Sequence, residues 1–328
     1  MEQIVKLLKQ HNSFIIAGHI GPDGDTIGSC YALARALDKL GKKAGVLLES
    51  YAAKYNIIPG REYLVRGKEP LQADVFIALD CADPERLGTA RAFFDAANIT
   101  ICIDHHETNE GFADHNLIIP TASATAEIVF GIVDALVEID SDIAVAIYSG
   151  IVGDTGGFRY SSTSRYTMEL AARLMDMGIP FTDIYGELMH GHSFEAAKAF
   201  GLALGHSKTA FGGRVIYTHI TKEMLKSTGA DSSDMDSVAE YLMSTRGAEV
   251  AIFMYEKHPC KEDTRGELKK IKVSMRSHGI HVGRIAASLG GGGHRMAAGC
   301  TIVGTMDGVL NKVLALVEQD ISEATKWQ

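Results

Sequence analysis

The most constraining feature of the sequence is a set of short apolar runs that each end in carboxylate or imidazole side chains. The clearest run is Cys102-Ile103, which leads directly into Asp104-His105-His106. Polar groups at the end of a buried run are costly unless they are hydrogen-bonded or hold a ligand. Three other segments end in the same way: His19 to Asp25, Asp80 and Asp154. The pattern raises the question of whether the four segments meet at one site.

The apolar runs alternate with helical patterns through the first half of the chain. This alternation favours an α/β fold with a mainly parallel sheet that carries helices on both faces. Strands are predicted at residues 13–18, 45–49, 74–79 and 99–103. Helices are predicted at residues 25–40, 89–97, 123–138, 142–152, 164–177 and 181–190.

The rhythm changes near residue 195. Strands predicted at 249–256 and 267–276 follow each other with only the polar loop 257–266 between them. Adjacent strands without an intervening helix indicate a mixed sheet, and therefore a smaller second α/β domain. A length of 328 residues also favours two domains. We expect domains at 1–194 and 195–328, with the active site in the cleft between them.

Composition excludes several classes of protein. The sequence has no apolar run of 18 residues and no signal-peptide pattern at its start, so we expect a cytoplasmic protein without a membrane span. The five cysteines are scattered, without a CxxC pair, which favours buried reduced thiols. A net charge of −9 argues against binding to long nucleic acid, although a small anionic substrate is allowed. The oligomeric state is left open, and a homodimer is compatible with the sequence.

Each acidic segment also has a structural interpretation. Pro22-Asp23-Gly24 is ordinary turn chemistry, and Asp25 is in place to cap the following helix. Asp80 has the position of a helix cap, with Asp83 as a competitor for that role. Asp154, which stands among glycines, is compatible with a helix end. None of these segments identifies a site by itself.

The Asp104-His105-His106 triplet carries more information. If the backbone stays extended, Asp104 and His106 point one way and His105 the other. The two imidazoles would then have different roles, and Asp104 would orient one of the rings.

Taken together, the segments offer four carboxylates and two imidazoles. Such donors suit manganese or magnesium better than a thiolate zinc site. Six ligands exceed what one ion and a substrate need, whereas two ions sharing a carboxylate use them all, as in sites for in-line attack at phosphorus. The candidate ligands are His19, Asp23, Asp25, Asp80, His105 and Asp154.

These segments resemble the four motifs of the DHH phosphoesterases. The matching residues are His19-x-x-Pro22-Asp23-x-Asp25-x-x-Gly28-Ser29, Asp80, Asp104-His105-His106 and Asp154-Thr-Gly-x-Phe158. The later Gly290-Gly-Gly-Gly-His294-x-x-Ala297-Ala298-Gly299 resembles the signature of the DHH-associated C-terminal domain. Together the motifs cover nearly the whole chain in the expected order.

The resemblance implies a division of roles. Asp80 would bridge two divalent ions, which are expected to be Mn²⁺, with Mg²⁺ as the alternative. Asp104 would orient a ligand, and His106 would contact the scissile phosphate. The remaining ligands would divide into His19 and Asp23 for one ion, and Asp25, His105 and Asp154 for the other.

The glycine run suggests a second binding element. Gly291, Gly292 and Gly293, followed by His294, would expose backbone N–H groups as a nest for an anion. Arg276 would act as a bidentate phosphate donor beside Ser277. The alternative, a flexible linker, is less compatible with the regular elements on either side.

The resemblance implies a hydrolase that acts on short nucleotide substrates. The expected substrates are very short RNAs, cut to 5′-mononucleotides, and 3′-phosphoadenosine-5′-phosphate, cut to AMP. The alternative within the same chemistry is a phosphodiesterase for cyclic di-AMP or linear dinucleotides. A regulatory nucleotide-binding protein without turnover would have lost ligands, and an inorganic pyrophosphatase would lack the His294 signature.

Overall fold

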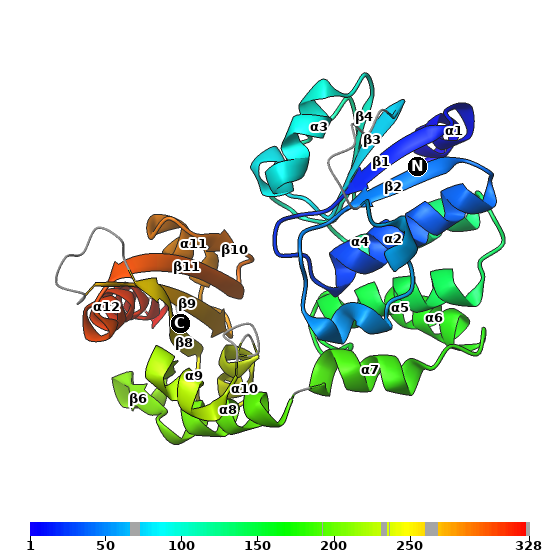
Figure 1. Cartoon of the computed structure of the whole chain (residues 1–328). Helices are drawn as coiled ribbons and strands as arrows, with labels where there is room; N and C mark the ends of the chain where they lie inside the picture. Colours follow the sequence, from blue (N-terminus) through cyan, green and yellow to red (C-terminus); the bar gives the residue numbers. More distant parts are fainter. Residues whose placement is uncertain (66–72, 192, 231–234, 236, 260–267, 326–328) are drawn as a thin grey trace. The chain divides into compact units, whose positions relative to one another are not determined.

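The computed structural model describes residues 1–65, 73–191, 193–230, 235, 237–259 and 268–325. Its contacts divide the chain into two compact units, Met1–Gly191 and His192–Gln328 (Figure 1). Of the polar segment 257–266, expected as a loop, residues 260–266 lie outside the described part, and residues 257–259 extend a strand.

The first unit is built on a five-stranded parallel sheet in the order β2-β1-β3-β4-β5. This confirms the expected parallel sheet. The edge strand β5 was not predicted, because it has only four residues and is half-exposed, so it lacks a continuous apolar run. The strands are β1 Ser13–Ala17, β2 Lys43–Leu47, β3 Val75–Leu79, β4 Thr100–Asp104 and β5 His115–Ile118.

Helices cover both faces of this sheet, as β1 illustrates. Phe14 and Ile16 pack in the large core with α2, α4 and α5, whereas Ile15 and Ala17 pack toward η3 and α3. Successive side chains of β1 point to opposite faces of the sheet and pack in two different cores. The strand is apolar throughout because both of its faces are buried. The helical elements are α1 Glu2–Gln10, α2 Gly24–Lys39, η1 Ala53–Ile57, η2 Arg61–Tyr63, η3 Pro84–Ala90, α3 Arg91–Ala96, α4 Thr125–Asp134, α5 Ser141–Asp154, α6 Arg165–Met175 and α7 Phe181–His190.

Helices α2 and α5 pack unusually closely. A Cβ atom at Gly28 would lie 2.2 Å from the carbonyl oxygen of Ala146, so only glycine allows this approach. Helix α4 is shorter than predicted and ends at Asp134. The prediction was too long because Leu136 and Val137, which follow the helix, also pack against the core and so continue its apolar pattern.

The second unit contains a six-stranded mixed sheet in the order β10-β11-β9-β8-β7-β6, as expected for this half of the chain. One face packs on α11 and α12, and the other packs on α8, α9 and α10. No helix in the described ranges is long and apolar enough to cross a membrane. The elements are α8 Phe194–Gly205, β6 Lys208–Ala210, η4 Phe211–Gly213, β7 Val215–Ile220, α9 Lys222–Thr228, α10 Val238–Met243, β8 Val250–Pro259, β9 Lys269–Ser277, α11 Val282–Ser288, β10 Gly292–Gly293, β11 Ala297–Gly304 and α12 Met306–Thr325.

Candidate metal centre

The candidate ligands gather at the carboxyl ends of three neighbouring strands. His19 follows β1, Asp80 follows β3, and Asp104 is the last residue of β4. Strand order reverses between β1 and β3, because the chain runs outward from β1 to β2 and then returns to the other side of β1. Ligand sites in open α/β sheets lie at such switch points, outside the carboxyl ends of the strands.

His19 lies at the centre of the first ligand group. Its Nδ1 donates to the carbonyl oxygen of Ile20 (2.9 Å), which directs Nε2 toward Asp80 Oδ2 (3.5 Å) and Asp23 Oδ2 (3.8 Å). A backbone carbonyl can only accept, so Nδ1 carries a proton in this contact and Nε2 is the nitrogen that faces the carboxylates.

Asp23 serves two purposes. Its Oδ1 accepts from the backbone N–H groups of Asp25 and Thr26 (3.0 and 3.1 Å) and so caps α2. Its Oδ2 faces His19. The residue that caps this helix is therefore Asp23 rather than Asp25, and capping leaves one carboxylate oxygen for the site.

The second ligand group comes from α2, α5 and the end of β4. His105 Nε2 lies 3.0 Å from Asp154 Oδ2, and its Nδ1 is 3.3 Å from the carbonyl oxygen of Ala122. Asp154 is the last residue of α5, and Asp25 is fully buried in the first turn of α2. One donor atom from each of Asp25, His105 and Asp154 falls within 4.8 Å of the others.

The two carboxylate oxygens of Asp80 face different histidines. Its Oδ2 faces His19, whereas its Oδ1 lies 3.8 Å from His105 Nε2 and 3.7 Å from His106 Nδ1. Its backbone has a φ of 57°, a left-handed conformation that a non-glycine residue rarely adopts. Asp83, not Asp80, caps the following helical turn, because its Oδ1 accepts from the backbone N–H of Arg86.

The two histidines of the triplet do not point in opposite directions. Strand β4 ends at Asp104, so strict alternation stops there, and both rings approach Asp80 with their centroids 4.9 Å apart. Asp104 Oδ1 contacts His106 Nδ1 at 2.7 Å. The ring that this carboxylate orients is therefore that of His106.

The protonation of the histidines reflects the surrounding carboxylates. Burial would lower the pKa of His19, but hydrogen bonds to Asp23 and Asp80 and their charges raise it to about 10. Burial would also lower the pKa of His105, but its contact with Asp154 and the nearby carboxylates raise it to about 11.

Neighbouring negative charges also raise the pKa values of two carboxylates of the site. Burial and the charges of Asp80 and Asp154 raise the pKa of Asp25 well above its usual value. Burial also raises the pKa of Asp154, as do the charges of Asp23 and Asp80, against the effect of His105. This excess of buried negative charge, with oxygen and imidazole donors, is what divalent cations such as Mn²⁺ and Mg²⁺ neutralise. The donor set therefore fits divalent metal binding.

Three residues that the sequence did not single out hydrogen-bond to carboxylates of the site. Thr26 and Thr125 donate to Asp80, and Asn109 Nδ2 donates to Asp104 Oδ2 (2.7 Å). All three are buried. The sequence gives only a weak signal for them, because each is a common polar residue near a predicted turn or helix start. Thr26 and Thr125 are also far from Asp80 in the sequence.

In the second unit, Arg276 and Ser277 stand next to each other on β9 but differ in environment. Arg276 is half-buried, and its Nη1 donates to the carbonyl oxygen of Met275 (3.1 Å). Ser277 is buried, and its hydroxyl donates to the carbonyl oxygen of Ile280 (2.5 Å). Arg276 pairs with Ala297 of β11, which brings it close to the turn that contains His294.

The glycine run is neither a flexible linker nor a fully open nest. The N–H groups of Gly290 and Gly291 donate to carbonyl oxygens at the end of α11, and Gly292 and Gly293 pair with β11. A Cβ at Gly291 would lie 2.2 Å from the carbonyl oxygen of Gly299, whereas one at Gly292 would meet nothing within 4 Å. Close packing therefore requires glycine at 291, and Gly292 faces open space.

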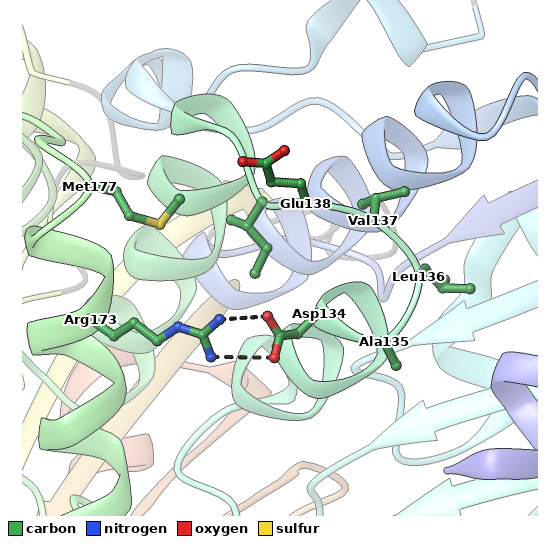
Figure 2. Close-up of a pocket in the computed structure, with 8 residues that line it drawn as sticks. Asp134, Ala135, Leu136, Val137, Glu138, Arg173 and Met177 are labelled. Atoms are coloured by element: carbon green, nitrogen blue, oxygen red, sulfur yellow. Dashed lines mark hydrogen bonds and ion pairs between the residues drawn. The ribbon is translucent and has the colours of Figure 1, made fainter.

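A separate hollow of about 560 Å³ lies at the C-terminal end of α4. Arg173 and Asp134 face each other across it and pair at 2.6 and 3.3 Å (Figure 2). Two of its three charged lining residues thus neutralise each other, the third being Glu138, and none of the candidate ligands lines it. We assign no chemistry to this hollow.

The sequence matches two family descriptions. Residues 13–151 match the DHH family, N-terminal domain, and residues 212–323 match the DHHA1 domain. Among solved structures, an exopolyphosphatase-related protein from Bacteroides fragilis is similar, with a TM-score of 0.85, 26% identity and coverage of 98% of this chain and 95% of that one. RecJ from Thermus thermophilus, solved with Mn²⁺, has a TM-score of 0.59 at 14% identity, over 98% of this chain and 54% of RecJ, and supports the fold alone.

Two curated relatives are similar to this chain over nearly its whole length. The bifunctional oligoribonuclease and PAP phosphatase NrnA of Thermus thermophilus is 30% identical, over 99% of this chain and 95% of the relative. The protein of the same name from Bacillus subtilis is 24% identical over 92% of each chain. The chain therefore belongs to the DHH family, with a DHHA1 domain following its DHH domain.

Proposed function

We propose that the protein is a metal-dependent phosphoesterase that cuts short oligoribonucleotides to 5′-mononucleotides and removes the 3′-phosphate of 3′-phosphoadenosine-5′-phosphate. The observation that carries this proposal is the position of Asp80: its carboxylate groups with His19 and Asp23 on one side and with His105 and His106 on the other, and His105 in turn groups with Asp25 and Asp154. The names of the full-length relatives in Thermus and Bacillus support the choice of substrates.

The ligand groups suggest how two ions would be held. His19 and Asp23 would bind one, Asp25, His105 and Asp154 the other, and Asp80 both. A pair of divalent ions, which we expect to be Mn²⁺, supplies Lewis-acid activation of water and neutralises charge at phosphorus. Carboxylate and imidazole donors also allow Mg²⁺.

His106 would contact the phosphate that is cut. Because Asp104 engages Nδ1 of this ring, Nε2 is the nitrogen that would face a phosphoryl oxygen. The ring would then lie next to the negative charge that develops during the reaction. Asp104 would keep the ring oriented.

The C-terminal unit would hold the rest of the substrate. Arg276 offers a guanidinium suited to phosphate and pairs with Ala297 of β11, the strand that also pairs with Gly292 of β10, and His294 lies in the turn between β10 and β11. Gly291 and Gly293 would shape this turn rather than contact the ligand, and Ser277 would support it from the buried face. We accordingly divide the chain into a metal-binding domain, residues 1–194, and a substrate-binding domain, residues 195–328.

The setting we propose is the cytoplasm. The four cysteines of the described part of the chain are free and buried, and such thiols persist in reducing compartments. A net charge of −9 disfavours long nucleic acid, which requires many phosphate contacts. Short substrates need only a few.

The test replaces the shared ligand. We expect Asp80→Ala to reduce hydrolysis of a diribonucleotide by several orders of magnitude in the presence of Mn²⁺, because both ions would lose a ligand. Wild-type turnover should also be compared on 3′-phosphoadenosine-5′-phosphate, dinucleotides and cyclic di-AMP. Near-normal turnover by the variant would refute the shared-ligand site, and preference for cyclic di-AMP would refute the proposed substrates.

A further inference from the structure

We infer that Thr125, together with Thr26, positions the shared carboxylate Asp80 and couples the two ligand groups to each other. The inference rests on the proposed function, since it concerns the same ions. Neither threonine belongs to the ligand set, and both are fully buried.

Both oxygens of Asp80 accept a hydroxyl hydrogen bond. Thr26 Oγ1 donates to Oδ2 at 2.5 Å from helix α2, and Thr125 Oγ1 donates to Oδ1 at 3.2 Å from helix α4. An ionised carboxylate only accepts, so both hydroxyl protons must point toward it. Two donors from two helices therefore fix the plane of the carboxylate.

Thr125 makes a second contact through its backbone. Its N–H donates to Asp25 Oδ2 (2.7 Å), and the N–H of Ala126 donates to Asp25 Oδ1 (2.8 Å). The N-cap of α4 is Ala124, which has no side-chain acceptor, so Asp25 satisfies these two donors from α2. A carboxylate at a helix N-terminus is stabilised by the aligned peptide dipoles.

Thr125 thus contacts two of the candidate metal ligands, Asp25 and Asp80. Thr125 fixes Asp25 of the second ligand group through its N–H, and Asp80, which lies between His19 and His105, through its hydroxyl. Asp80 needs this support because its left-handed backbone, with φ of 57°, lies outside the regular strand geometry. Without these donors its carboxylate would rotate under repulsion from neighbouring carboxylates.

The experiment measures Mn²⁺ affinity in the full-length chain, by the electron paramagnetic resonance signal of free Mn²⁺. Valine has nearly the shape of threonine but no hydroxyl. We expect Thr125→Val to weaken Mn²⁺ binding by about 10- to 100-fold, the usual effect of losing a group that supports a metal ligand. Thr26→Val should also weaken Mn²⁺ binding. Thr125→Ser keeps the hydroxyl donor and should bind Mn²⁺ with an affinity close to that of the wild type.

Thr167→Val is the matched control. Thr167 is also fully buried in the first unit and donates to a carboxylate, Glu127 Oε2, at 2.8 Å. It lies in α6, outside the ligand groups. We expect this variant to lower the melting temperature as Thr125→Val does, but to bind Mn²⁺ like the wild type.

Turnover separates positioning from a direct catalytic role. At saturating Mn²⁺, kcat of Thr125→Val should return toward the wild-type value, because the ions then hold Asp80 in place. If Thr125→Val and Thr26→Val bind Mn²⁺ as tightly as the wild type while the wild type hydrolyses dinucleotides, the inference is overturned and the proposed function stands. If the wild type itself neither binds Mn²⁺ nor turns over, both fail.

Discussion

Asn109 illustrates how a residue outside the ligand set can control the chemistry of the site. Its Nδ2 donates to Asp104 Oδ2 at 2.7 Å and to the carbonyl oxygen of Cys81 at 3.1 Å. Asp104 in turn contacts His106 at 2.7 Å. A chain of three side chains therefore sets the orientation of the imidazole that we propose as the phosphate contact.

Replacing Asn109 should slow the chemical step. We expect Asn109→Ala to lower kcat by about 10- to 100-fold, because Asp104 loses a donor and holds His106 less firmly. Mn²⁺ affinity should change little, since the side-chain amide of Asn109 donates to Cys81, Cys102 and Asp104 and to none of the six candidate ligands in the described structure. Steady-state kinetics and Mn²⁺ titration check both points.

Asn116→Ala is a suitable control, because Asn116 also makes two hydrogen bonds, to the backbone of Ala113, away from the ligands. Its kcat should stay close to the wild-type value. Equal losses of kcat and Mn²⁺ affinity in Asn109→Ala would contradict the proposed role.

Adjacent glycines near His294 give a second contrast between single residues. Gly291→Ala would place a methyl group 2.2 Å from the carbonyl oxygen of Gly299, whereas Gly292→Ala has open space. Overpacking of this kind costs roughly 1–3 kcal/mol. We therefore expect only Gly291→Ala to lower the free energy of unfolding of the second unit markedly, as measured by denaturant titration. A Gly292→Ala variant of equally low stability would contradict this description of the turn.

At the scale of elements, a cluster of charges ties α5 to α2. Asp140 caps α5 by accepting from the backbone N–H of Ile143 (3.1 Å). It also pairs with Arg35 (2.9 Å) and Lys39 (3.2 Å) of α2. Burial would raise the pKa of Asp140, but the contacts with Arg35, Ile143 and Lys39 hold it below its usual value.

This lowered pKa makes a pH-dependent contribution to stability. Asp140→Asn keeps the cap but loses the charge, so it isolates the ion pairs, which we expect to contribute about 0.5–1 kcal/mol. The contribution is complete above the unfolded-state pKa of about 3.9 and disappears as pH falls through the lower folded-state pKa.

Thermal unfolding from pH 7 down to pH 2 checks the prediction. The gap between wild type and Asp140→Asn should be constant at neutral pH, narrow below about pH 4, and shrink at high salt because exposed charges are screened. A gap that widens in acid would contradict the assignment.

Elements with a strong periodic pattern could be predicted from the sequence. Buried strands such as Val75–Leu79 stand out as continuous apolar runs, and α5 as a long apolar stretch. Short elements such as β5 or α9 could not, because four to seven residues with mixed polarity carry no distinct period. Helix α4 was overestimated, since side chains beyond its end still pack inward.

At the scale of the whole molecule, the sequence predicted which residues converge but not how they are supported. Parallel strands bring their carboxyl ends to one edge, so the meeting of His19, Asp80 and His105 follows from topology. Thr125 could not be recognised in the same way, because its contact with Asp25 spans 100 residues and depends on where α4 begins. The orientation of the two histidines likewise depends on β4 ending at Asp104.

Our proposal requires two metal ions that share Asp80. Anomalous diffraction at the manganese edge, from crystals grown with Mn²⁺, would locate the ions. We expect two peaks that both lie at bonding distance from the Asp80 carboxylate, one beside His19 and Asp23 and the other beside Asp25, His105 and Asp154. A single peak, or two peaks of which only one contacts Asp80, would contradict it.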